Sequence, residues 1–252
     1  MKISAVVLIS FFVGASGLAQ SRASSSRSVW IEDYTEAQVK AAVAAGKTTL
    51  IYSGCSSLAV ANHIQVARYV AQRVAEELTN ALVLPITSSA PATAAPRRSG
   101  TVSLSDEAYG VVNRAITAGG FRNVMIMADD GIRPGDITFE EVATRLDVDW
   151  KSKGVRAYYI DAHEMRPGQG LTFNGDYLRR WAGRTVPAGR RQSVEDAAEL
   201  LFVDREHKWL RQDMIPPEDR AVVSSELGKL FVEGRVASIL NQIRTLSPSH
   251  LR

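Results

Sequence analysis

Side chains that can transfer protons or bind cations follow directly after three short apolar runs of the sequence. These segments are Gly54-Cys55-Ser56-Ser57, Asp129-Asp130-Gly131 and Asp161-Ala162-His163-Glu164, and His63 opens the helical pattern that comes after the first of them. In a parallel sheet, ligands bind outside the carboxyl ends of the strands. The carboxylates and imidazoles of three separate strands are therefore candidates to meet in one crevice.

Plainer roles for the same residues remain open. Asp129, Asp130 and Asp161 could form turns or cap the helices that follow, which is the commoner role of an aspartate after a strand. Cys55 could act as a nucleophile, since it stands at a strand end with His63 eight positions further on. The alternative for Cys55 is a partly buried, unreactive thiol.

The elements that would position these residues alternate along the chain. We predict strands near residues 48–53, 81–87, 124–128 and 155–160, separated by helices over 63–79, 105–118 and 139–153. Strands that are apolar on both faces and separated by helices indicate a parallel sheet with helices on both sides. The fold class is therefore α/β, a three-layer α/β/α arrangement with a mostly parallel central sheet. The C-terminal third is predicted to be helical over 193–202, 217–233 and 236–244.

The first 19 residues have the pattern of a signal peptide. Lys2 precedes an apolar run over residues 3–13, and Gly17-Leu18-Ala19 supplies the small residues that signal peptidases need. A permanent anchor is the alternative, but the run is shorter than the roughly 20 residues of a membrane-spanning helix. We expect cleavage after Ala19, a Ser/Arg-rich leader over 20–28 and one domain over 29–252. The product would be exported, periplasmic or secreted, with no membrane attachment after cleavage.

Composition excludes several classes of protein. A single cysteine allows no internal disulfide and no thiolate zinc site. The net charge of +3, from 30 basic and 27 acidic residues, describes a mildly basic surface. We expect no nucleic-acid binding, because the sequence has no dense basic stripe and no recognisable nucleic-acid module.

Four segments resemble, in the same order, those of the creatininase (creatinine amidohydrolase) family. They are Trp30-Ile31-Glu32-Asp33-Tyr34-Thr35, Ser99-Gly100-Thr101-Val102-Ser103-Leu104, Gly120-Phe121-Arg122-Asn123-Val124 and Gly154-Val155-Arg156-Ala157-Tyr158-Tyr159-Ile160-Asp161. The resemblance covers the chain from about Trp30 to Arg244. It implies a layered α/β/α fold, assembly into a homo-oligomer and two divalent metals that help to open an amide or related carbon–nitrogen bond.

The family's metal-binding motifs are only partly present. Where the family has a glutamate and a histidine, this chain has a shortened segment from Gly54 to His63. His63 and Asp130 stand at ligand positions, and Asp129, Asp161 and His163 could complete a reduced site for one zinc or manganese ion. The family's pocket element is matched by Pro187-Ala188-Gly189 and, after an insertion, by Asp196 and Glu199, with its histidine missing.

The resemblance therefore implies an eroded dinuclear site with little or no activity of the family's kind. Two divalent cations held close together repel each other unless anionic ligands lie between them. The alternative is an active hydrolase with a rebuilt one-metal or cysteine-based site, in which Cys55, Asp196 and Glu199 are the catalytic candidates. Without a metal, Ser56, Ser57 and Arg133 would line a polar pocket for a small molecule.

Overall fold

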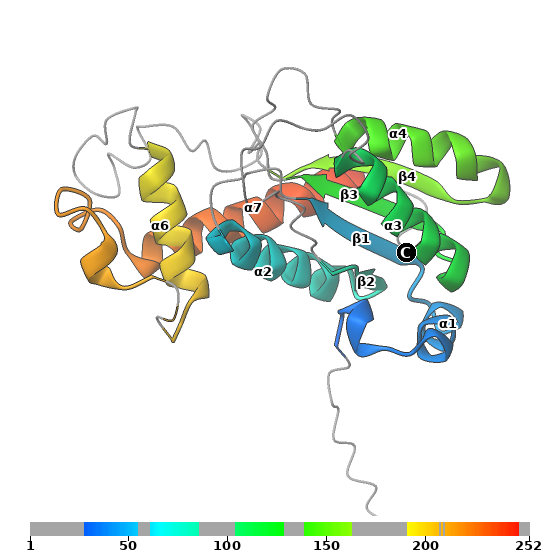
Figure 1. The fold of residues 1–252 in the computed structure, drawn as a ribbon, viewed down its shortest axis with the longest axis horizontal. Coiled ribbons are helices and arrows are strands. Elements are labelled where there is room, and N and C mark those ends of the chain that lie inside the picture. The colour runs from blue at the N-terminus through cyan, green and yellow to red at the C-terminus, as the bar shows by residue number, and fades with distance from the viewer. Residues whose placement is uncertain are drawn as a thin grey trace, which may run out of the picture.

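The computed structural model describes residues 28–54, 61–85, 104–128, 139–162, 191–206, 208 and 210–246. This part of the chain contains four strands and six α-helices (Figure 1). The strands are β1 (Thr49–Gly54), β2 (Ala81–Val83), β3 (Asn123–Ala128) and β4 (Arg156–Asp161). The helices are α1 (Glu36–Ala44), α2 (Ala61–Leu78), α3 (Leu104–Gly119), α4 (Phe139–Trp150), α6 (Arg191–Val203) and α7 (Ser225–Leu246).

The four strands form one sheet in the order β2-β1-β3-β4, and every pair is parallel. The predicted strands are confirmed to within one residue at each end of β1, β3 and β4. β2 ends at Val83, and residues 86–87 of the predicted strand lie outside the described residues. The outer edge of β2 is met by the segment before α1, where Trp30 forms a parallel bridge to Val83.

Helices cover both faces of the sheet, which gives the predicted three layers (Figure 1). Side chains alternate along each strand between the two faces. In β1, Ile51 packs with α2 and α7, whereas Leu50 and Tyr52 pack with α1, α3 and α4. All three are at least 98% buried, so apolar burial on both faces stabilises the sheet.

A third apolar cluster joins α6 to the start of α7 and to the segment over residues 210–223, at one end of the molecule. Val194 and Ala198 of α6 and Leu227 of α7 are fully buried in it. This cluster fixes α6 beside the layered domain, where it also contacts α2.

Two helices differ from the sequence-based prediction. We did not predict α1, although Thr35 and Gln38 form a capping box at its start, in which each side chain bonds the other residue's backbone N–H. The two helices predicted over 217–233 and 236–244 are one helix that begins later, at Ser225. Residues 217–222 form turns, since Pro216 and Pro217 lack backbone N–H donors, and the Ser224 hydroxyl accepts from the N–H of Leu227 and caps α7.

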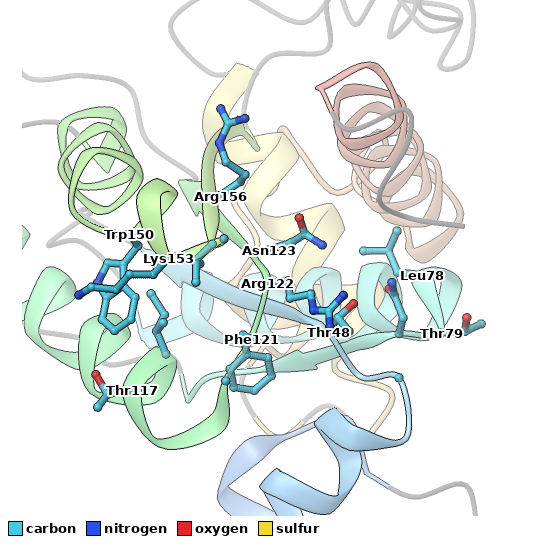
Figure 2. A pocket seen from close by; sticks show the side chains of 16 residues that line it. Thr48, Leu78, Thr79, Thr117, Phe121, Arg122, Asn123, Trp150, Lys153 and Arg156 are labelled. Atoms are coloured by element: carbon cyan, nitrogen blue, oxygen red, sulfur yellow. The ribbon is translucent and has the colours of Figure 1, made fainter.

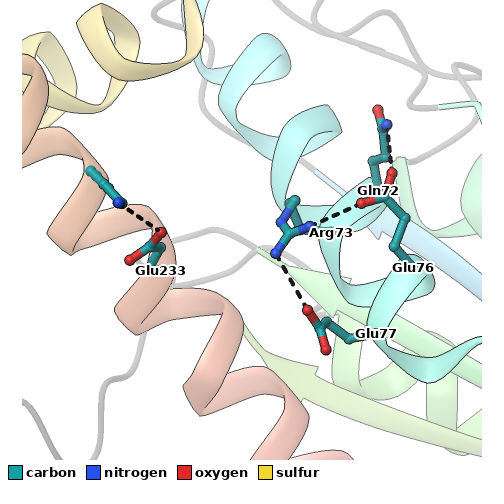
Figure 3. A network of polar contacts seen from close by, with 6 residues as sticks. Gln72, Arg73, Glu76, Glu77 and Glu233 are labelled. Atoms are coloured by element: carbon teal, nitrogen blue, oxygen red, sulfur yellow. Dashed lines mark hydrogen bonds and ion pairs between the residues drawn. The ribbon is translucent and has the colours of Figure 1, made fainter.

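Exposed ion pairs lie along α2, beside the groove between α2 and α7 (Figure 3). Arg73 contacts Glu76 at 3.1 Å and Glu77 at 3.3 Å, and its side chain is 42% exposed. On α7, Lys229 lies 3.7 Å from Glu233. Pairs of this kind contribute at most about 1 kcal/mol each, because water and salt screen them. Among the described helices, none has the length and hydrophobicity that crossing a bilayer requires.

Thr79, directly after α2, has a left-handed backbone with φ of +59°. This conformation crowds a β-branched side chain, and glycine adopts it without that strain. We expect Thr79→Gly to raise the free energy of unfolding by about 0.5–1 kcal/mol, after allowing for the greater freedom of glycine in the unfolded chain. Urea denaturation measures this change, and a loss of stability would show that Thr79 is not strained.

Candidate functional site at the carboxyl edge of the sheet

The carboxyl ends of β1, β3 and β4 are level with one another. Gly54 pairs with Ala128, and Ala128 pairs with Asp161, so the last residues of the three strands form one row across the sheet. The strand order reverses between β1 and β3, and ligands of open parallel sheets bind outside the carboxyl ends at such a point. The three segments singled out in the sequence therefore leave the sheet side by side at this edge.

Most of the candidate residues follow this row directly and lie outside the described residues. They are Cys55, Ser56, Ser57, Asp129, Asp130, Arg133 and His163. His63 belongs to the first turn of α2, where the description covers the backbone and not the side chain. Three candidates, Asp161, Asp196 and Glu199, are described in full.

Asp161 ends β4 and is held there by α7. The side-chain amide of Gln242 accepts from the backbone N–H of Asp161 at 3.1 Å and donates to its carbonyl oxygen at 2.8 Å. Gln242 is 9% exposed, so this double hydrogen bond lies in the interior. This pair of hydrogen bonds fixes the backbone at the end of β4 and does not involve the Asp161 carboxylate.

Asp196 and Glu199 lie on α6 and line a cavity of about 240 Å³. Val66 of α2 lines the same cavity, and Figure 1 shows α6 beside the start of α2. His63 precedes Val66 by one helical turn, so the fold brings α6 and the first turn of α2 to the same end of the sheet. The other lining residues are Ser193, Ala197, Leu200, Leu210, Met214, Ile215 and Pro216.

Glu199 is not a free carboxylate. Its Oε1 accepts a hydrogen bond of 2.6 Å from Arg235 of α7, and the two side chains are 4% and 8% exposed. Glu195, one turn earlier on α6, lies 3.7 Å from the same guanidinium nitrogen and is 27% exposed. Because Arg235 neutralises Glu199, this carboxylate is better suited to holding α6 against α7 than to abstracting a proton.

Sequence reasoning missed a buried polar stripe on α7. Arg235, Ser238 and Gln242 are spaced three and four residues apart, which places them on one side of the helix, and they are 6%, 4% and 9% exposed. The stripe links α6 through Glu199 to the end of β4 through Asp161. The sequence pattern that could have indicated this stripe is the helical spacing of its three polar residues, next to apolar residues at the same spacing: Val232, Val236, Ile239 and Ile243.

Within the ranges that the structure describes, no group of three or more His, Cys, Asp or Glu residues is placed to hold a metal ion. The described residues thus supply the framework of the edge: the level strand ends, the start of α2, and two carboxylates on α6 beside it. No protein-family model, no curated protein and no solved structure matches the chain.

Proposed function

We propose that this chain is an exported, divergent relative of the creatininase-type amidohydrolases, whose dinuclear metal site has eroded and which has little or no activity on non-peptide carbon–nitrogen bonds. It would bind a small molecule at the carboxyl edge of its sheet, in a pocket lined by Ser56, Ser57 and Arg133. Assembly into a homo-oligomer is part of the proposal by resemblance.

One observation carries this proposal. The row Gly54, Ala128 and Asp161 places the ends of β1, β3 and β4 side by side, and the two motifs that match the family's metal-binding segments follow β1 and β3 in the sequence. In this chain those segments offer His63 and Asp130 at matching positions, whereas a catalytic metal site needs at least three protein ligands and an open position. The ion pair between Glu199 and Arg235 adds support, because it occupies a carboxylate that would otherwise be available to a cation or a substrate.

The alternative is an active hydrolase with a rebuilt site. The specific observation in its favour is the position of His63 in the first turn of α2, close in sequence to Cys55. His63 lies one helical turn before Val66, which lines the same cavity as Asp196. A cysteine–histidine pair or a single zinc or manganese ion could use this region.

We expect the purified protein, supplied with Zn²⁺ or Mn²⁺, to show no hydrolysis of creatinine or related cyclic amides above a heat-denatured sample. The reason is the shortage of ligands to activate a water molecule. Product formation followed by chromatography measures this directly. Turnover that disappears in His63→Ala and persists in Cys55→Ser would establish a metal-dependent enzyme, and loss in both variants would establish a cysteine-based one.

Export is tested separately by N-terminal sequencing of the mature protein. Cleavage after Ala19 predicts a first residue of Gln20 in the exported fraction. A chain that starts at Met1 in the cytoplasmic fraction would contradict export without bearing on the site.

A further inference from the structure

One side of α7 is open to solvent along most of the helix. Six residues on this side are spaced alternately four and three positions apart, which is the spacing of residues at a contact between two helices. We call this set the α7 seam, and its members are Glu226, Leu230, Glu233, Ala237, Leu240 and Arg244. The two end residues and the two central residues are exposed, whereas Leu230 is half-buried and Leu240 is 7% exposed.

A groove of about 170 Å³ lies beside the α7 seam, between α7 and α2 (Figure 3). Its walls come from the two helices and consist of Tyr69, Arg73, Glu77, Val232, Glu233, Val236, Ala237 and Leu240. Leu230 belongs to none of the three apolar clusters of the described residues. The seam and the groove therefore present apolar surface that another helix could cover.

The order of residues along the α7 seam is self-complementary. Two copies of α7 can lie antiparallel about a two-fold axis level with residue 235, so that the first residue of one seam faces the last residue of the other. The facing pairs are then Glu226 with Arg244, Leu230 with Leu240, and Glu233 with Ala237. Opposite charges meet at both ends of the contact, leucines meet inside them, and the small alanine lets the helices approach at the centre.

The charges at the ends of the α7 seam are available for this contact. Neither Glu226 nor Arg244 forms an ion pair or a side-chain hydrogen bond within the described residues. They lie about five helical turns apart and so point in the same direction from the helix. The two copies of Glu233 approach the axis, and Lys229, which lies 3.7 Å from Glu233 in each copy, offsets their repulsion.

We propose that this chain forms a two-fold dimer in which two copies of α7 pack antiparallel through the α7 seam, over the groove beside α2. The partner is a second copy because the seam complements its own reverse, as a two-fold interface requires. The contact between two helices is small, so we expect a dimer that dissociates on dilution. This inference rests on the proposed function only in naming a surface for its homo-oligomer, and the metal site plays no part in it.

Sedimentation velocity of the purified protein over about a hundredfold range of concentration should show a reversible change from monomer to dimer. Arg244→Glu and Glu226→Arg should each weaken the dimer at least about tenfold, because each replaces two attractive pairs by two repulsive ones. Arg122→Glu is the matched control and should leave association unchanged. Arg122 is also an exposed arginine, but it lines a pocket at the amino edge of the sheet to which α7 contributes no residue (Figure 2).

Mixing the two charge variants tests which residues face each other. An equimolar mixture of Glu226→Arg and Arg244→Glu should form a heterodimer, because an arginine then faces a glutamate at both ends of the contact. The double variant Glu226→Arg/Arg244→Glu should dimerise within about threefold of the wild type for the same reason. Circular dichroism confirms that each variant is folded.

The leucines of the contact are tested in the same way. Leu230→Ala should weaken the dimer about tenfold, because it removes apolar contacts at two places in the interface. Leu246→Ala is the control, since Leu246 is 45% exposed on the opposite side of α7 and should not affect association.

Three results would overturn the proposed dimer. The first is a chain that stays monomeric at every concentration, and the second is an equal effect of Arg244→Glu and Arg122→Glu. The third is a mixture of the two charge variants that stays monomeric. An oligomer that is insensitive to both charge reversals would overturn the α7 interface and leave the homo-oligomer of the proposed function in place. The eroded metal site is measured separately by metal content, so the two proposals fail independently.

Discussion

Arg235→Ala is expected to lower the free energy of unfolding by about 3–5 kcal/mol, because it removes the cation that the buried carboxylate of Glu199 contacts. The arginine and Glu199 are 8% and 4% exposed and share a 2.6 Å hydrogen bond between α7 and α6. Removing one member of a buried pair exposes the other to the full cost of desolvation. Urea denaturation followed by circular dichroism measures the change.

Arg73→Ala is the matched control, since Arg73 of α2 also contacts two glutamates but its side chain is 42% exposed (Figure 3). Its removal should cost less than about 1 kcal/mol. Replacing both charges of the buried pair, with Arg235→Met and Glu199→Leu together, should recover most of the stability lost in Arg235→Ala. Equal losses in Arg73→Ala and Arg235→Ala would contradict the view that this ion pair holds α6 in place.

Gly228→Ala is expected to destabilise the protein by about 3 kcal/mol or more, because the new methyl group would overlap the backbone of α6. A Cβ at this position would lie 1.8 Å from the carbonyl oxygen of Ala198 and 2.4 Å from its carbonyl carbon. Backbone atoms in a packed helix cannot rotate away as a side chain can. The two helices would have to separate, and the apolar cluster around Phe231 would open.

Gly110→Ala provides the control, because it makes the same substitution within α3, where the nearest atom is a flexible Arg114 nitrogen at 3.5 Å. Alanine favours helix over glycine, so this variant should gain about 0.5–1 kcal/mol. Thermal or urea denaturation measures the change in stability of both variants. A Gly228→Ala protein as stable as the wild type would show that α6 and α7 do not pack this closely.

Arg235→Ala and Gly228→Ala both disturb the contact between α6 and α7. This contact holds Asp196 and Glu199 of α6 near the start of α2. The contact between α6 and α7 could not be predicted from the sequence, because a glycine or an arginine within a helix has the same local pattern whether it faces solvent or another helix. The contact between Gly228 and Ala198 depends on how α6 and α7 cross, which is a tertiary property. The same holds for Gln242, whose partner at the end of β4 is 81 residues away in sequence.

The sheet, in contrast, could be predicted from the sequence. Four apolar runs separated by helical patterns were sufficient to predict parallel strands covered on both faces, and β1, β3 and β4 follow this prediction closely. The convergence of their carboxyl ends also followed, because it is a consequence of parallel pairing.

The measurement that tests the central proposal most directly is the metal content of the purified protein. After dialysis against trace Zn²⁺ and Mn²⁺ and then against metal-free buffer, elemental analysis should find no stoichiometric pair of metal ions per chain, because His63 and Asp130 are too few ligands to hold two mutually repelling cations. His63→Ala should have the same metal content as the wild type. Two equivalents of zinc or manganese that fall in His63→Ala would contradict the eroded site, and one equivalent that falls in that variant would establish the rebuilt one-metal site in its place.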